Sequence, residues 1–240
     1  MNFKKLNFKL ILAILYLIVL SIGLYYLFSV IDLKDLNDYE FYKSNQDLVY
    51  KFKDKNFIFS VIIFLIGVII WNLFLGMGTP VAIAGGFIFG KWLGTFLIVT
   101  GNTIGAVLIY LLAKNFLKSF IEKNLSHKFS KFIIFFNRND LFYYMFFRLV
   151  GGGGTPFAIQ NLIPVIFNMS VKKYFIATYI GVIPTTFVTV ALGSGIGTFI
   201  GENDELSFLS VISTPEIYLP IAGFLILIPC FFILKKILFK

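Results

Sequence analysis

The chain has 240 residues, of which 58% are hydrophobic and only 14% are charged, and its formal net charge is +9. A soluble domain has about 25% charged and roughly 45–50% apolar residues, so a single soluble core could not bury this many apolar side chains. The same numbers exclude disorder, which needs low hydrophobicity, and the single cysteine, Cys230, excludes an intrachain disulfide framework. The composition therefore predicts a polytopic membrane protein.

Long stretches without any charged residue predict an all-α integral membrane protein. A membrane-spanning helix needs about 20 mostly apolar residues, and a bilayer cannot satisfy an open backbone. The uncharged stretches are 10–31, 56–90, 92–113, 149–171, 174–201 and 217–234. The first predicts an N-terminal transmembrane anchor within residues 1–31, with a cleaved signal peptide as the alternative, and the last predicts a C-terminal transmembrane helix after an acidic loop, within residues 201–240.

The charged residues are unevenly distributed, and their distribution predicts an orientation. Cytoplasmic loops carry an excess of lysine and arginine. Basic residues dominate the charged residues of segment 114–140 and of the C-terminal tail, whereas all charged residues of 202–216 are acidic. We therefore expect both termini in the cytoplasm and the mixed segment 32–56 as an extracytoplasmic loop. A small protein with short loops favours the plasma membrane of a bacterium.

A glycine- and proline-containing break splits the second apolar stretch into a helical hairpin. Gly76-Met77-Gly78-Thr79-Pro80 interrupts the stretch, and both glycine and proline break helices. The following arm, Thr79 to Gly90, would be about 18 Å long at 1.5 Å per residue and would span only half a bilayer. This length predicts a re-entrant arm that returns to its own side of the membrane.

The glycine- and proline-containing motif is repeated 76 residues later in the sequence. Residues 76–83 and 152–159 are identical at six of eight positions, and Ile104-Gly105 falls on Ile180-Gly181 at the same offset. The two units, about 57–113 and 133–200, start on opposite sides of the membrane, which predicts an inverted repeat, an arrangement found in transporters. The alternative is that the glycines of 76–78 and 151–154 only permit tight turns or close helix packing.

Arg148 is the sharpest candidate for a functional residue. A guanidinium within an apolar segment is costly and normally faces a cavity or a partner, and arginine binds phosphate with a planar fork. We expect it to engage a lipid phosphate. The alternative is an arginine that snorkels or binds backbone carbonyls to hold the hairpin.

Polar groups and helix starts near the two tips predict an anion site. Helix N-termini point unpaired N–H groups outward and favour anions, and proline suits a first helical turn. The side chains beyond the second tip could bind a headgroup, or they could satisfy carbonyls freed by the broken helix. The candidate substrate-binding residues are Gly78, Thr79, Pro80, Arg148, Thr155, Pro156, Gln160 and Asn161.

Two groups of residues resemble the motifs of the DedA superfamily, also called the VTT-domain or SNARE-associated Golgi protein family. The first group is Gly85-Gly86-Phe87-Ile88-Phe89-Gly90 followed by Asn102-Thr103-Ile104-Gly105-Ala106 and Lys114. The second is Arg148, Pro156, Asn161, Pro164 and Lys172 followed by residues 175–184, which end in Gly181-Val182-Ile183-Pro184. The resemblance covers about residues 57–200.

This resemblance implies lipid scrambling or flipping, or proton-coupled transport. The chain departs from the family by a glycine run after Arg148 and by the absence of any acidic residue between Asn56 and Gly90, which puts a carboxylate proton relay in doubt. We expect a protein that moves phospholipid or polyprenyl-phosphate headgroups between leaflets, with membrane lipids as partners. The alternatives are an ion-coupled small-molecule transporter and a membrane scaffold without transport activity.

Four further residues are expected to have structural roles: Gly105, Gly181, Pro184 and Lys114. No histidine, cysteine and carboxylate cluster suits a metal, and the apolar segments lack the groups that a catalytic triad needs. The sequence therefore predicts neither an enzyme nor a bound cofactor. It leaves open whether the chain forms a homo-oligomer.

Overall fold

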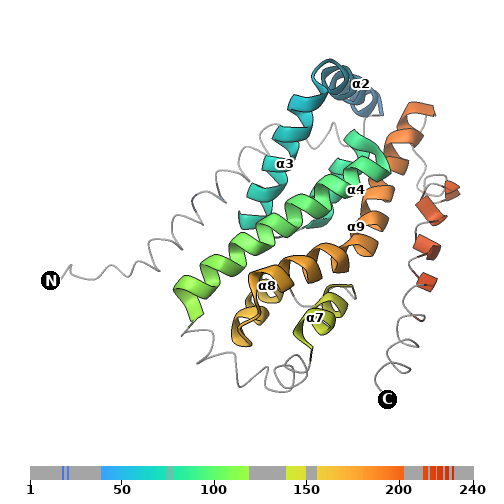
Figure 1. Ribbon diagram of the computed structural model, residues 1–240. Helices are drawn as coiled ribbons and strands as arrows, with labels where there is room; N and C mark the ends of the chain where they lie inside the picture. The colour runs from blue at the N-terminus through green and yellow to red at the C-terminus, as the bar shows by residue number, and fades with distance from the viewer. Residues whose placement is uncertain are drawn as a thin grey trace.

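The computed structural model describes residues 39–74, 76, 78–118, 139–149 and 156–202, together with a few isolated residues near each end of the chain. Every regular element in these ranges is helical (Figure 1). Most of the predicted N-terminal anchor, residues 151–155 of the second tip and half of the predicted C-terminal helix (217–234) lie outside the described residues. Their predicted structures therefore stay predictions.

The segment 32–56, predicted as a loop, contains helix α2 (Tyr39–Lys55). This helix was not predicted from the sequence, and the extracytoplasmic position of the segment stays a prediction. Two side chains of α2 fix it to the rest of the protein. Gln46 Nε2 donates to the carbonyl of Gly197 at 2.7 Å, and the Tyr50 hydroxyl donates to the carbonyl of Phe87 at 2.9 Å.

The first unit is a helix followed by a short arm and a long helix. Helix α3 (Phe57–Phe74) ends before Gly76, whose φ of 65° turns the chain. Helix α4 (Gly78–Leu112) then contains a sharp break at Gly90, with φ 74° and ψ 175°. The arm between these two glycines has the length expected from the sequence. A π-helical turn, η2 (Ala113–Leu117), follows α4.

The second unit has the same order of elements. Helix α7 (Asp140–Leu149) precedes the second tip, and helix α8 (Phe157–Ile166) forms a short arm after it. A turn with Asn168 at φ 52° leads into the long helix α9 (Val171–Glu202), which continues through Pro184. At the offset of 76, Gly90 falls on Ile166, so the two short arms end at equivalent positions.

The short arm of α4 packs directly on α9, as the crossing ribbons in Figure 1 show. A Cβ atom on Gly86 would lie 1.8 Å from the carbonyl oxygen of Val190, and one on Gly193 would lie 2.0 Å from that of Ile83. Small residues allow helix backbones to approach this closely inside a membrane. These glycines therefore join the first unit to the second.

Within each unit, the long helix approaches the preceding helix through an equivalent glycine. A Cβ on Gly105 would lie 2.8 Å from Cβ of Asn72, and one on Gly181 would lie 2.7 Å from Cβ of Arg148 and 2.5 Å from the carbonyl oxygen of Met145. Asn72 and Arg148 are also 76 residues apart. The contact is therefore repeated at the same offset as the sequence, and it is consistent with the structural role predicted for both glycines.

The helices are apolar and long enough to make this a membrane protein. Two stretches, Gly78–Asn115 and Val171–Ile200, have the length and composition of membrane spans, and the pair formed by α2 and α3, bent by 112°, would add a third if it were one span. Helix α3 also exposes isoleucine at every fourth position: Ile58, Ile62, Ile66 and Ile70. Such an exposed apolar stripe suits contact with lipid tails.

Candidate functional site

A cavity of about 240 Å³ lies where the two units meet. The start of α4 contributes Gly78 and Thr79 to its wall, and α8 contributes Phe157 and Gln160. Arg148 at the end of α7 reaches it from the second unit. The structure thus brings residues next to both predicted tips to one cavity, although the tips are more than 70 residues apart in the sequence.

Arg148 is almost completely buried, with 2% of its surface exposed. Its Nη1 donates to Oε1 of Gln160 at 2.9 Å. Its Nη2 donates to Oδ1 of Asn161 and, at 3.1 Å, to the hydroxyl of Tyr174. This burial argues against a side chain that snorkels to water, and among the described residues its acceptors are side chains rather than backbone carbonyls. Its binding of a lipid phosphate stays a prediction.

Aromatic rings enclose the guanidinium. Its central carbon lies 5.3 Å from the ring centroid of Tyr144 and 5.3 Å from that of Phe157. Tyr144 is itself fixed by its hydroxyl, which donates to the carbonyl of Gln160 at 2.8 Å. Phe157 also approaches the first tip, since a Cβ on Gly76 would lie 3.4 Å from its ring. The rings exclude water from Arg148 and favour its cationic form.

The positive charge of Arg148 has no carboxylate partner among the described residues. Its hydrogen-bond acceptors are neutral, and Nε of Arg148 and Nδ2 of Asn161 are buried without a partner. The nearest acid on its own helix, Asp140, pairs with Lys173 instead. An isolated buried charge costs several kcal/mol, and this cost would fall if an anion entered the adjacent cavity.

The other predicted site residues are distributed unevenly. Asn161 is buried behind Arg148 and does not line the cavity, and its side-chain oxygen accepts hydrogen bonds from Arg148 and, at 2.8 Å, from Tyr174. Pro80 and Pro156 are exposed at the starts of α4 and α8 and do not line the cavity. Thr155 lies outside the described residues. Gln160 and Asn161 therefore hold the guanidinium, a role that the sequence interpretation did not consider.

Four polar residues that line the cavity were missed as site residues: Asn102, Thr185, Thr186 and Thr189. Asn102 is held by the amide of Asn72, whose Nδ2 donates to its Oδ1 at 2.6 Å. The threonines occupy positions i, i+1 and i+4, which lie on one face of a helix. Hydroxyls repeated on one face of an otherwise apolar helix were the signal that could have found them.

Lys114, expected to be structural, lies in the π-helical turn η2. Its ammonium is 5.6 Å from the ring centroid of Tyr110 and does not line the cavity. Within the described ranges, no group of histidine, cysteine and acidic residues could hold a metal ion. The chemistry available at the cavity is thus binding by one cation, amides, hydroxyls and the first backbone N–H groups of α4.

The sequence of the cavity-forming region matches a known family, the VTT domain, over residues 77–195. This chain carries a VTT domain. The matched range contains every residue that lines the cavity, from Gly78 to Thr189, and excludes α2 and α3. The resemblance to the DedA and VTT superfamily seen in the sequence motifs is therefore confirmed.

Curated relatives of this VTT-domain chain are transmembrane proteins. Transmembrane protein 41B of Xenopus laevis is 29% identical over 136 residues, which cover 55% of this chain and 48% of the frog protein. The Transmembrane protein 41 homolog of Caenorhabditis elegans is 27% identical over 154 residues, covering 60% of this chain and 59% of the worm protein. The chain thus spans about half the length of the relatives it matches. No solved structure matches it significantly.

Proposed function

We propose that this protein moves phosphate-bearing lipid headgroups, of phospholipids or polyprenyl phosphates, between the two leaflets of a membrane, as a scramblase or flippase. The observation that carries the proposal is the buried Arg148, which has no carboxylate partner in the described residues and lines the cavity between the two units. A lipid phosphate would supply the missing negative charge and accept the N–H groups of the guanidinium.

The size of the cavity suits a headgroup rather than a whole lipid. At about 240 Å³ it is smaller than the roughly 300–1,000 Å³ of pockets that enclose drug-sized ligands. The acyl chains would therefore stay in the bilayer while the headgroup passes through the protein. The threonine face of α9 offers hydroxyls along this route.

The same proposal places the two short arms in the bilayer as re-entrant hairpins of an inverted repeat. The arm of α4 spans only half a bilayer at about 1.5 Å per residue, and irregular backbone is tolerated at membrane depth where it is buried in protein or lines a cavity. The contacts of Gly105 and Gly181 at the same offset support the repeat. The distribution of basic residues favours an orientation with both termini in the cytoplasm, and the small size and short loops favour the plasma membrane of a bacterium.

Reconstitution into liposomes that contain a fluorescent phospholipid tests this function. Dithionite bleaches only the outer-leaflet probe of sealed liposomes unless the protein moves lipids between leaflets. We expect bleaching of both leaflets by the wild-type protein and loss of inner-leaflet bleaching in Arg148→Lys, because an ammonium cannot reproduce the planar fork. Arg138→Lys, the same substitution at the chain's only other arginine, should retain the activity.

The possible results separate the proposal from its alternatives. Lipid movement that requires a proton gradient would indicate a coupled transporter. No lipid movement by the folded wild-type protein would indicate a scaffold. Unaltered movement in a folded Arg148→Lys variant would remove the phosphate-binding role of this residue.

A further inference from the structure

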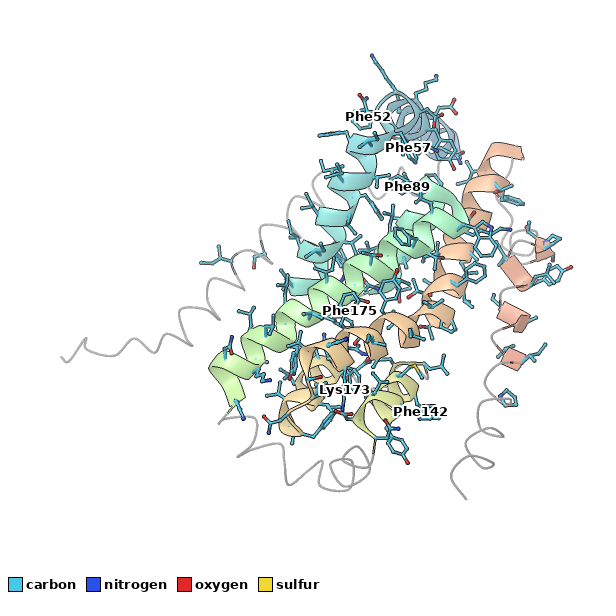
Figure 2. The ribbon with its side chains drawn as sticks, in the orientation of Figure 1. Phe52, Phe57, Phe89, Phe142, Lys173 and Phe175 are labelled. Carbon is cyan, nitrogen blue, oxygen red and sulfur yellow. The ribbon has the colours of Figure 1, made fainter. Side chains whose placement is uncertain are left out.

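A second and larger cavity lies at the other side of the first unit. It is a groove of about 820 Å³ between α2, α3 and the short arm of α4. Its walls are largely apolar, with side chains such as Phe52, Phe64, Trp71, Ile88 and Phe89. Figure 2 shows Phe52 and Phe89 at this end of the molecule. The groove shares no lining residue with the central cavity, and most of it lies outside the matched VTT range.

Helix α2, which forms one wall, has the character of a helix at a membrane surface. It carries Lys51, Lys53 and Lys55 and also exposes Leu48 and Phe52. It meets α3 at a bend of 112°. An amphipathic, lysine-rich helix at a steep angle to an apolar helix is typical of the boundary between headgroups and acyl chains.

Two lining residues of the groove are polar, and each lacks a strong partner. The hydroxyl of Ser60 is in a side chain only 6% exposed and has no hydrogen-bond partner. The ammonium of Lys53 lies 4.6 Å from the ring centroid of Tyr50 and 3.5 Å from the carboxylate of Asp54. Asp54 is 73% exposed, so solvent weakens that ion pair.

We propose that this groove is a binding site for an anionic phospholipid, with an acyl chain on its apolar wall and the phosphate on Lys53. The unpartnered hydroxyl of Ser60 would donate to an ester or phosphate oxygen of the same lipid. The apolar wall accommodates the chain, the lysine selects the charge, and the buried hydroxyl gains its missing hydrogen bond. This site goes beyond the proposed transport function and does not rest on it, because the central cavity lies elsewhere.

The position of the tryptophans allows a direct test. The chain has two tryptophans: Trp71 lines the groove, and Trp92 is 74% exposed beside Phe187. Full-length Trp92→Phe, reconstituted with phospholipids brominated on their acyl chains, reports occupancy through quenching of Trp71. We expect brominated phosphatidylglycerol to outcompete brominated phosphatidylcholine by about fivefold, the effect of one lysine. Lys53→Gln should abolish this preference.

Two glycine-to-leucine substitutions, one inside the groove and one outside it, test whether the lipid occupies the groove. Gly67 lines the groove, and a Cβ there meets no atom within 4 Å, so Gly67→Leu should obstruct part of the groove without displacing the backbone. Gly223 is equally open but does not line the groove. We expect the headgroup preference at Trp71 to disappear in Gly67→Leu and to persist in Gly223→Leu and in Arg148→Lys.

The reverse reporter, Trp71→Phe, leaves Trp92 to report ordinary boundary lipid, and no headgroup preference is expected there. Equal quenching of Trp71 by both lipids would overturn the proposal, as would a preference that survives Gly67→Leu. Weak quenching of Trp71 by both lipids would also overturn it and would indicate that another part of the protein fills the groove. Loss of lipid movement in Arg148→Lys with an intact preference at Trp71 would separate the two sites.

Discussion

The two units pack their helices in the same way but carry different side chains at equivalent positions. Three positions related by the offset of 76 lie at the contact between the helices of each unit. They are Asn72, Gly85 and Ile98 in the first unit and Arg148, Asn161 and Tyr174 in the second. In the first unit, a Cβ on Gly85 would lie 3.0 Å from the Ile98 side chain. In the second, Asn161 and Tyr174 hydrogen bond to each other at 2.8 Å.

This difference shows that the repeat provides the helix packing, while a different residue type at one equivalent position provides the candidate anion site. Asn72 is neutral: its Nδ2 donates to the carbonyl of Val68 at 2.8 Å and to Asn102, while its Oδ1 is buried without a partner. It therefore carries no charge that an anion would have to balance. Arg148 carries a charge that its neutral partners do not balance. A site that needs an anion therefore exists on only one side of a nearly symmetric arrangement, and breaking the two sides separately should have unequal effects.

The largest effect is expected for Asn161→Leu. The substitution removes an acceptor from a buried guanidinium and from the Tyr174 hydroxyl. A hydrogen bond to a charged group contributes about 1.5–3 kcal/mol and one between neutral groups about 0.5–1.5 kcal/mol, so this substitution loses both contributions. Gly85→Ala at the equivalent position should cost less, because the new methyl group meets side-chain atoms only, Cγ1 of Ile98 at 3.0 Å and Cζ of Phe64 at 3.1 Å. Titration with a denaturing detergent in mixed micelles measures both free energies of unfolding.

A double-mutant cycle makes this prediction specific to the charge. In an Arg148→Met background there is no cation to leave unpartnered, so Asn161→Leu should cost much less than in the wild-type protein. An equal cost in both backgrounds would show that Asn161 contributes by packing alone.

The next effect distinguishes the two equivalent glycines. Gly181→Ala should destabilise the protein by about 1–3 kcal/mol, the usual cost of overpacking, because its methyl group would lie 2.5 Å from the backbone oxygen of Met145. Gly105→Ala should cost less, since its nearest backbone oxygen, of Ile69, is 3.4 Å away. Thermal unfolding in detergent measures both, and Gly223→Ala, with open space around it, should be neutral. The reverse order would contradict the assignment of the tighter contact to the second unit.

The scaffold could be predicted from the sequence because its signals are local. Apolar stretches, helix-breaking glycines and a repeated motif can each be recognised within a few residues, and they predicted the breaks at Gly76 and Gly90. The predicted structural glycines, Gly105 and Gly181, lie at close helix contacts. Helix α2 was missed for the opposite reason. Its helix is stabilised by distant partners, the carbonyls of Phe87 and Gly197, and nothing near it in the sequence shows them.

The sequence pattern singles out Arg148 as a candidate site residue, but it does not predict which side chains Arg148 contacts. Arg148 could be singled out because one guanidinium in an apolar segment is conspicuous. Its contact with Tyr174, 26 positions away, depends on how α7 packs on α9, and no sequence spacing encodes that geometry. The same limit applies to Asn102 and the threonines of α9, which become part of one cavity only when α4 and α9 cross.

An effect smaller than that of Asn161→Leu is expected when the network around Arg148 loses one hydroxyl. Tyr174→Phe removes a group that accepts from Arg148 and donates to Asn161, and hydrogen bonds to charged groups contribute about 1.5–3 kcal/mol. Tyr110→Phe is the matched control, because its ring stacks on Tyr174 and its hydroxyl donates only to the neutral carbonyl of Met169. We expect the unfolding free energy to fall more for Tyr174→Phe than for Tyr110→Phe. The difference should vanish in an Arg148→Met background, and its persistence there would mean that the charge is not its source.

The smallest effect is expected where the charge of the second unit is exposed. Lys173 pairs with Asp140 at 2.8 Å across the ends of α9 and α7, with 52% and 22% of their side chains accessible. Exposed ion pairs contribute about 0–1 kcal/mol, so Asp140→Asn should lower the unfolding free energy by less than about 1 kcal/mol. Added salt should abolish this loss, since the screening length falls to about 3 Å at 1 M. The cost of Asn161→Leu should persist at the same salt concentration, because ions do not enter the buried network around Arg148. If salt weakened both effects equally, the guanidinium would be open to solvent, and the cavity beside it would have no need of an anion.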